Sequence, residues 1–270
     1  MTMTTTTLGV QRSTTLGPVH KAGFGNALAF EWIKIKSVRS TMWSLFAAAA
    51  MVIGIGTLAA YNVSAGSDEP AVMEHIYGGL LFGQVAILVF GVLAATAEYG
   101  TGTISSSFTA VPSRTRLLAA KALVVWLVST VAGLAVSTVT FIAGRAAVPS
   151  GHAVLPSIAE GSVLRAVVGA GLYLGLLGLF ALALGLIVRA SAGAVAAAIS
   201  ATLVLPIAFI LIGKFGQYLT EWWPTEAGRQ VLSLQQQPHN LAPVTGLLYF
   251  AAVTVTVLAA AVTLVNHRDA

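Results

Sequence analysis

The chain has 270 residues, a formal net charge of +5 and no cysteine, and only 9% of its residues are charged, against ~25% in ordinary soluble domains. The lack of cysteine excludes disulfides, thiolate metal sites and cysteine nucleophiles. So few charges exclude a large soluble helical core, because the polar residues could not cover a surface that faces water.

Six apolar stretches occupy most of the chain, and each is close to the about 20 residues that a helix needs to cross a bilayer. We therefore predict an all-α polytopic membrane protein with six transmembrane helices and an N-terminal interfacial helix. A threonine-rich disordered cytoplasmic tail over residues 1–23 is expected to precede a single transmembrane domain over 24–270. The expected spans are about 42–61, 76–96, 118–143, 164–188, 192–213 and 244–265.

The segment Asn26–Arg39, before the first span, has apolar side chains at helical spacing. Glu31, Lys34 and Arg39 fall on the opposite side of such a helix, which fits a helix that lies in the membrane interface. The alternative is a plain basic flank that only sets the topology. The candidate residues of the interfacial helix are Glu31, Trp32, Lys34, Lys36 and Arg39.

The polar segment 97–116 joins the second and third spans and is longer than a simple turn requires. Glu98 lies where the span leaves the bilayer, and Gly100 and Gly102 permit tight backbone geometry. The pattern favours a compact helix-turn unit with a docking role, against the alternative of an ordinary loop. The segment lacks the Gly-Lys-Ser/Thr ending of a phosphate loop, so we do not expect it to bind a nucleotide.

Lys and Arg are unevenly distributed, and the positive-inside rule converts this bias into an orientation. The first loop, 62–75, contains Asp68, Glu69 and Glu74 but no basic residue, so we expect it outside. We predict a protein of the cytoplasmic membrane with both termini in the cytoplasm, and we attribute the positive charge to topology rather than to nucleic-acid binding. The expected cytoplasmic basic residues are Arg12, Lys21, Lys34, Lys36, Arg39, Arg114, Arg116, Lys121, Arg189 and Arg268.

The last outer segment, 214–243, is too long for a turn and contains two adjacent tryptophans, Trp222 and Trp223, followed by Pro224. Aromatic side chains beside a proline are typical of short helices that dip into the membrane interface. A merely exposed loop rarely contains two adjacent tryptophans, so we predict short interfacial helices here.

The spans contain little that could do chemistry. An ion-coupled carrier is expected to have buried carboxylates, whereas the acidic residues fall at or beyond the predicted span ends. An intramembrane protease needs clustered acids, or serine with histidine, at membrane depth, and no histidine accompanies the serines of the spans. No pair of histidines has metal-ligand spacing, so we expect no metal site. Asn62, Gln84 and Tyr173 could contact cargo or join helices by hydrogen bonds.

Three segments together resemble the membrane subunits of type-2 ABC exporters. The basic helix from Glu31 to Thr41 precedes six spans, as in that family, and the stretch from Glu98 to Ile104 resembles its first cytoplasmic loop. Trp223-Pro224, followed by Ala227-Gly228, resembles its outer hairpin before the last span.

The resemblance implies a permease without an ATPase site of its own, which forms the translocation pathway and is coupled to a separate ATP-binding subunit that holds ATP and magnesium. It also implies a second permease copy or homologue. The alternative is an ion-coupled secondary transporter or a non-transport membrane scaffold. By this resemblance, the residues that couple the permease to the ATPase are Glu98, Gly100, Gly102, Thr103 and Ile104.

Overall fold

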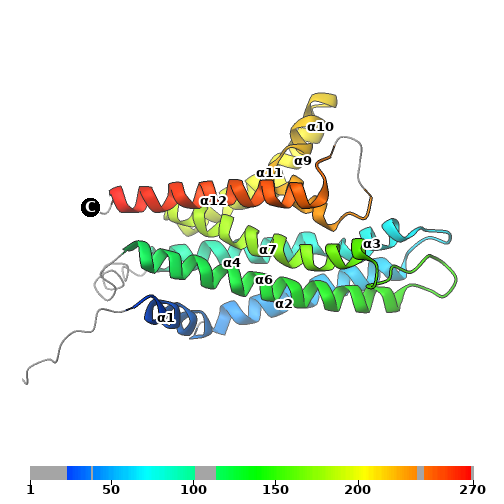
Figure 1. Cartoon of the computed structure of the whole chain (residues 1–270), viewed down its shortest axis with the longest axis horizontal. Coiled ribbons are helices and arrows are strands. Elements are labelled where there is room, and N and C mark those ends of the chain that lie inside the picture. Colours follow the sequence, from blue (N-terminus) through cyan, green and yellow to red (C-terminus); the bar gives the residue numbers. More distant parts are fainter. Residues whose placement is uncertain (1–22, 38, 101–113, 236–239, 269–270) are drawn as a thin grey trace, which may run out of the picture.

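The computed structural model describes residues 23–37, 39–100, 114–235 and 240–268, and these residues form an elongated bundle of helices (Figure 1). The predicted tail over residues 1–23 lies outside the described residues except for Gly23. The α-helices are α1 (Phe24–Ser37), α2 (Arg39–Tyr61), α3 (Glu69–Tyr77), α4 (Leu80–Gly100), α6 (Arg114–Ala147), α7 (Gly161–Val188), α8 (Ser191–Ile199), α9 (Leu205–Ile210), α10 (Lys214–Glu221), α11 (Pro224–Arg229) and α12 (Pro243–Arg268).

The described residues confirm an all-α polytopic membrane protein. Five helices are long and apolar enough to cross a bilayer, and α2 contributes a shorter apolar stretch, Leu45–Tyr61. Helix α1 and the end of α12 lie at one end of the bundle, which we call the terminal end; α3 and the turn after α6 lie at the far end (Figure 1).

The centre of the bundle is α7, which packs most extensively against α6, α4 and α12. Helices in lipid associate through close backbone approach at small residues rather than through the hydrophobic effect. Gly91 of α4 illustrates this, because a Cβ atom there would lie 2.4 Å from the carbonyl oxygen of Gly178 in α7. The glycine-rich composition of the fourth span therefore brings its neighbours close to it.

The second span begins later than the sequence indicated. Ile76 belongs to a separate short helix, α3, and α4 starts only at Leu80, after the pair Gly78-Gly79. Asp68 caps α3, because its side chain accepts a hydrogen bond from the backbone N–H of Ala71 at 3.1 Å. The first outer connection is therefore partly helical rather than a plain loop.

The fifth span is interrupted by one π-helical turn, Ser200–Val204, between α8 and α9. Pro206 follows this turn and has no N–H to donate, so the hydrogen-bond ladder must adjust before it. Trp223 Nε1 donates a 2.6 Å hydrogen bond to the carbonyl of Ala201. The short helices predicted for the outer segment are present as α10, α11 and a 3-10 turn, η2 (Gln230–Leu232).

Polar side chains inside the bundle join helices. Ser137 Oγ of α6 donates to the carbonyl of Val167 in α7 at 2.9 Å and lies 2.9 Å from the hydroxyl of Tyr77, which therefore donates to it. Tyr173 donates to Gln84 Oε1 at 3.1 Å. For Ser137, Gln84 and Tyr173 the structure thus provides partners within the protein.

Candidate functional site

The terminal end of the bundle brings together the segments that the sequence analysis selected. Helix α4 ends there at Gly100, α6 begins there at Arg114, and α1 packs against α6 (Figure 1). The tight turn between α7 and α8 lies at the same end, with Arg189 in the left-handed backbone conformation at φ 59°. This end therefore presents α1 beside the two helix ends that flank residues 101–113.

The orientation of α1 differs from the one expected for Glu31. Ala27 and Glu31 are buried, at 1% and 3% exposure, whereas Trp32 and Ile33 are exposed at 45% and 66%. Glu31 is therefore not on the polar outer side with Lys34, because it faces the bundle. The apolar side chains that point away from the bundle are suited to contact lipid, which fits an interfacial helix.

The basic residues of α1 lie around this apolar surface. Lys36 Nζ lies 4.9 Å from the ring centroid of Trp32, within the range of a cation–π interaction. Lys34 is half-buried. Arg39 is the first residue of α2, and its side chain lies outside the described residues.

A buried ion pair fixes α1 to the bundle. Lys121 Nζ of α6 lies 3.3 Å from Glu31 Oε2, and the two side chains are only 3% and 4% exposed. The same ammonium donates a hydrogen bond of 3.2 Å to the backbone carbonyl of Ala94 in α4. One lysine therefore joins three elements: the interfacial helix, the end of the second span and the start of the third.

Sequence reasoning counted Lys121 among the cytoplasmic basic residues and placed no acidic residue inside a span, so it missed this pair. A signal was present, because Glu31 is the only acidic residue before the first span and Lys121 is the first lysine after the loop. Burial of either charge alone is costly, so each needs the other. Pattern along the chain cannot show which two such residues meet in space.

A second link at the terminal end joins α4 to α8. Ser191 Oγ donates to Thr96 Oγ1 at 2.8 Å, and Thr96 Oγ1 donates to the carbonyl of Val92 at 3.1 Å. Helix α4 is thus held through Ala94 on one side and through Thr96 on the other. A displacement of this end of α4 would therefore also displace α1, α6 and α8.

The predicted coupling residues are only partly described. Glu98 and Gly100 belong to the last turn of α4, but the side chain of Glu98 lies outside the described residues. Gly102, Thr103 and Ile104 fall within residues 101–113, also outside the described residues. Their role therefore stays a prediction.

The part of the chain that the structure describes contains no cluster of metal-binding side chains. No group of three or more His, Asp and Glu side chains there could hold a metal ion. The titratable pair at the terminal end, Glu31 with Lys121, is mutually neutralised and joined to a backbone carbonyl. Such a pair suits the positioning of helices.

Comparison with known proteins agrees with this architecture. The sequence matches the family model described as ABC-2 family transporter protein over residues 27–217, more than half of the chain. A comparison with curated proteins found no match. The matched range contains most of α1, the Glu31–Lys121 pair and the first five spans. The chain is therefore a member of the ABC-2 transporter family and a membrane permease of an ABC transporter.

Proposed function

We propose that this permease is the transmembrane subunit of an ATP-driven exporter, and that its terminal end faces the cytoplasm and receives the movement of a separate ATP-binding subunit. The observation that carries the proposal is the Lys121 junction, which fixes α1 to α4 and α6 beside the segment 101–113. Family membership supports a permease, and the bias of basic residues toward this end supports its cytoplasmic orientation.

The proposed coupling surface consists of α1 and the loop that follows α4. Its residues are Glu98, Gly100, Gly102, Thr103 and Ile104 in the loop region, with Trp32, Lys34, Lys36 and Arg39 at or beside the interfacial helix. Glu31 lies beneath this surface and joins α1 to Lys121. Closure of the partner ATPase would displace this surface, and the displacement would favour one of two conformations of the transmembrane helices. ATP and magnesium would be held by the ATPase.

The complete exporter would contain two permeases and two ATPases. Large apolar side chains of α9 and the residues that follow it are exposed, among them Ile207, Ile210 and Leu211 at 59%, 60% and 85%. Figure 1 shows this part diverging from the bundle. Lipid or a second permease would cover it.

The test uses the permease co-purified with its ATPase in proteoliposomes. Changing Glu98→Ala or Gly102→Pro should lower transport and transport-stimulated ATP hydrolysis, while Glu160→Gln, at the opposite end before α7, should leave both unchanged. Unchanged ATP hydrolysis and transport in both loop variants would contradict the proposal. Transport that persists without ATP but stops with an ionophore would favour the ion-coupled alternative.

A further inference from the structure

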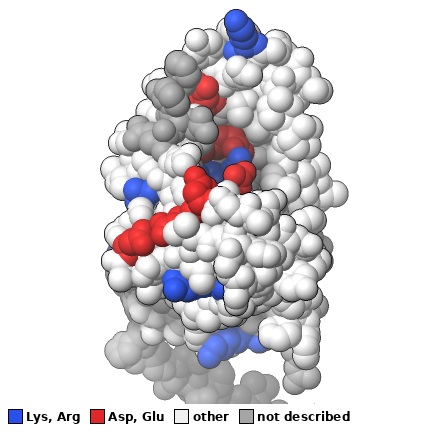
Figure 2. Space-filling view, turned by 90° about the vertical axis from the view of Figure 1, so that its right-hand side faces the viewer, with Lys and Arg blue, Asp and Glu red and all other residues white. Residues whose placement is uncertain are grey.

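A polar cavity of about 650 Å³ opens at the far end of the molecule, remote from the proposed coupling surface. One wall is formed by α3 and the start of α4, and the other by α11, η2 and the chain that follows. Figure 2 shows this end, where acidic side chains border a hollow that contains a basic side chain. The volume is typical of sites for small ligands.

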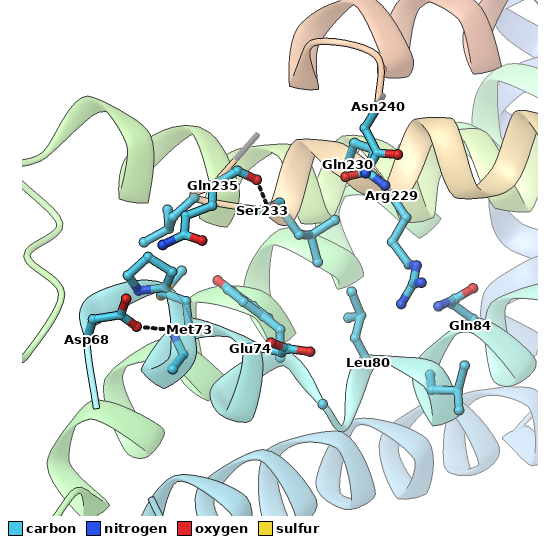
Figure 3. A pocket seen from close by; sticks show the side chains of 17 residues that line it. Asp68, Met73, Glu74, Leu80, Gln84, Arg229, Gln230, Ser233, Gln235 and Asn240 are labelled. Atoms are coloured by element: carbon cyan, nitrogen blue, oxygen red, sulfur yellow. Dashed lines mark hydrogen bonds between the residues drawn. The ribbon is translucent and has the colours of Figure 1, made fainter. Parts of the chain in front are cut away.

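Two hydrogen-bond donors converge at one end of the cavity. Gln84 is 97% buried, and its Oε1 accepts from Tyr173, but its amide Nε2 makes no hydrogen bond to any described residue. Figure 3 shows this nitrogen facing the guanidinium of Arg229 across the cavity. Two donors that face each other require an acceptor between them.

Arg229 keeps donors available for such an acceptor. Its Nε and Nη2 donate to Glu226 Oε2 at 3.0 and 2.6 Å, which orients the guanidinium. A guanidinium has five N–H groups, and half of the Arg229 side chain remains exposed. This end of the cavity is therefore suited to a ligand oxyanion, which arginine can bind through parallel hydrogen bonds.

Two carboxylates also line the cavity: Asp68 lies at the end remote from Gln84, and Glu74 lies between Asp68 and Arg229 (Figure 3). Asp68 is engaged in capping α3. Glu74 is exposed to the cavity and makes no ion pair within 4 Å to a described residue. Its carboxylate is suited to an ammonium group that can donate hydrogen bonds.

We propose that the cavity binds a zwitterionic headgroup of the phosphoethanolamine class, with its phosphate between Gln84 and Arg229 and its ammonium at Glu74. Phosphatidylethanolamine supplies this chemistry from the membrane. Leu80 and Leu81 line the same cavity, and Leu81 and its neighbour Phe82 are exposed at 44% and 46%. The acyl chains would lie along this apolar surface of α4, which favours a lipid over a water-soluble ligand.

The site can be tested on the purified full chain in detergent, without an ATPase, so its outcome is independent of the proposed transport function. Native mass spectrometry would compare the binding of phosphatidylethanolamine with that of phosphatidylglycerol, which has a phosphate but no ammonium. The wild-type chain should prefer phosphatidylethanolamine. Glu74→Gln should weaken its binding by about fivefold, the effect of one partly exposed ion pair, and should leave phosphatidylglycerol binding unchanged.

The matched control is Glu69→Gln, which removes a carboxylate from the same helix outside the cavity lining and should change neither lipid. Gln84→Leu combined with Tyr173→Phe removes the amide without stranding the tyrosine hydroxyl, and should weaken both lipids. An unchanged lipid preference in Glu74→Gln, or an equal loss in Glu69→Gln, would overturn the proposal. Equal affinity for soluble O-phosphoethanolamine and the lipid would overturn the assignment to a lipid.

Discussion

Replacing Lys121 by methionine tests the junction at the terminal end. The substitution keeps an unbranched side chain but removes the ammonium that lies 3.3 Å from Glu31 and donates to the carbonyl of Ala94. At this separation two unit charges attract by about 5 kcal/mol for an effective dielectric constant of ~20. The cost of burying the charges offsets part of this attraction in the intact protein.

The single change removes one charge of the pair but leaves the Glu31 carboxylate, which is 3% exposed in the intact protein, at its buried position. Breaking a buried ion pair on one side typically destabilises a protein by about 3–5 kcal/mol, whereas replacing both partners by apolar residues is often neutral. We therefore expect Lys121→Met to lower the free energy of unfolding by about 3–5 kcal/mol. The double variant Lys121→Met with Glu31→Leu should recover most of this loss.

The assay is a double-mutant cycle on unfolding of the purified chain in detergent, followed by tryptophan fluorescence. Glu31→Leu alone completes the cycle, and the interaction free energy should be about 2 kcal/mol or more in favour of the pair. Arg116→Met, which removes an exposed cation from the start of the same helix, controls for loss of a cation as such. Additive single effects, with no recovery in the double variant, would refute the assignment of the pair as the link between α1 and α6.

Two further predictions concern packing within the membrane domain. Gly91→Ala places a methyl group against the backbone of α7 and should lower the free energy of unfolding by about 1–3 kcal/mol. The methyl group of Gly54→Ala meets nothing within 4 Å, so this control should be neutral or stabilising. Thermal unfolding compares the two variants, and equal effects would contradict the close approach of α4 and α7. Trp223→Phe keeps an aromatic ring beside Phe209, which lies 5.2 Å away between centroids, but removes the hydrogen bond to Ala201. It should cost about 1 kcal/mol and speed hydrogen exchange across residues 200–210, and unchanged exchange there would argue against a stabilising role for the tryptophan.

The spans were predictable because length and hydropathy are properties of consecutive residues. The separation of α3 from α4 was missed because the pair Gly78-Gly79 sits within an otherwise apolar stretch. Asp68 followed by Pro70 was a usable signal for the start of α3, since aspartate caps helices and proline is accepted in the first turn. The π-helical turn at Ser200–Val204 had only the weaker signal of Pro206.

The candidate site was predictable as a region but not as a set of contacts. The basic amphipathic segment and the long loop identified the terminal end, because both depart from what spans and turns require. The orientation of α1 was wrong for Glu31, because helical spacing alone cannot distinguish a polar face toward water from a charge that meets Lys121. That partner lies 90 positions away in the sequence, and only the packing of α1 on α6 brings them together.

Helix α4 connects the two ends of the molecule. Gln84 lies in the far cavity, and the carbonyl of Ala94 receives the Lys121 hydrogen bond about 15 Å away along the same helix. Between them, Gly91 brings α4 against α7 at the distance of backbone contact, so α4 has little room to bend. A shift of its terminal end would therefore move Gln84 relative to Arg229. Because such coupling is reciprocal, a ligand that holds Gln84 and Arg229 together would resist the same shift.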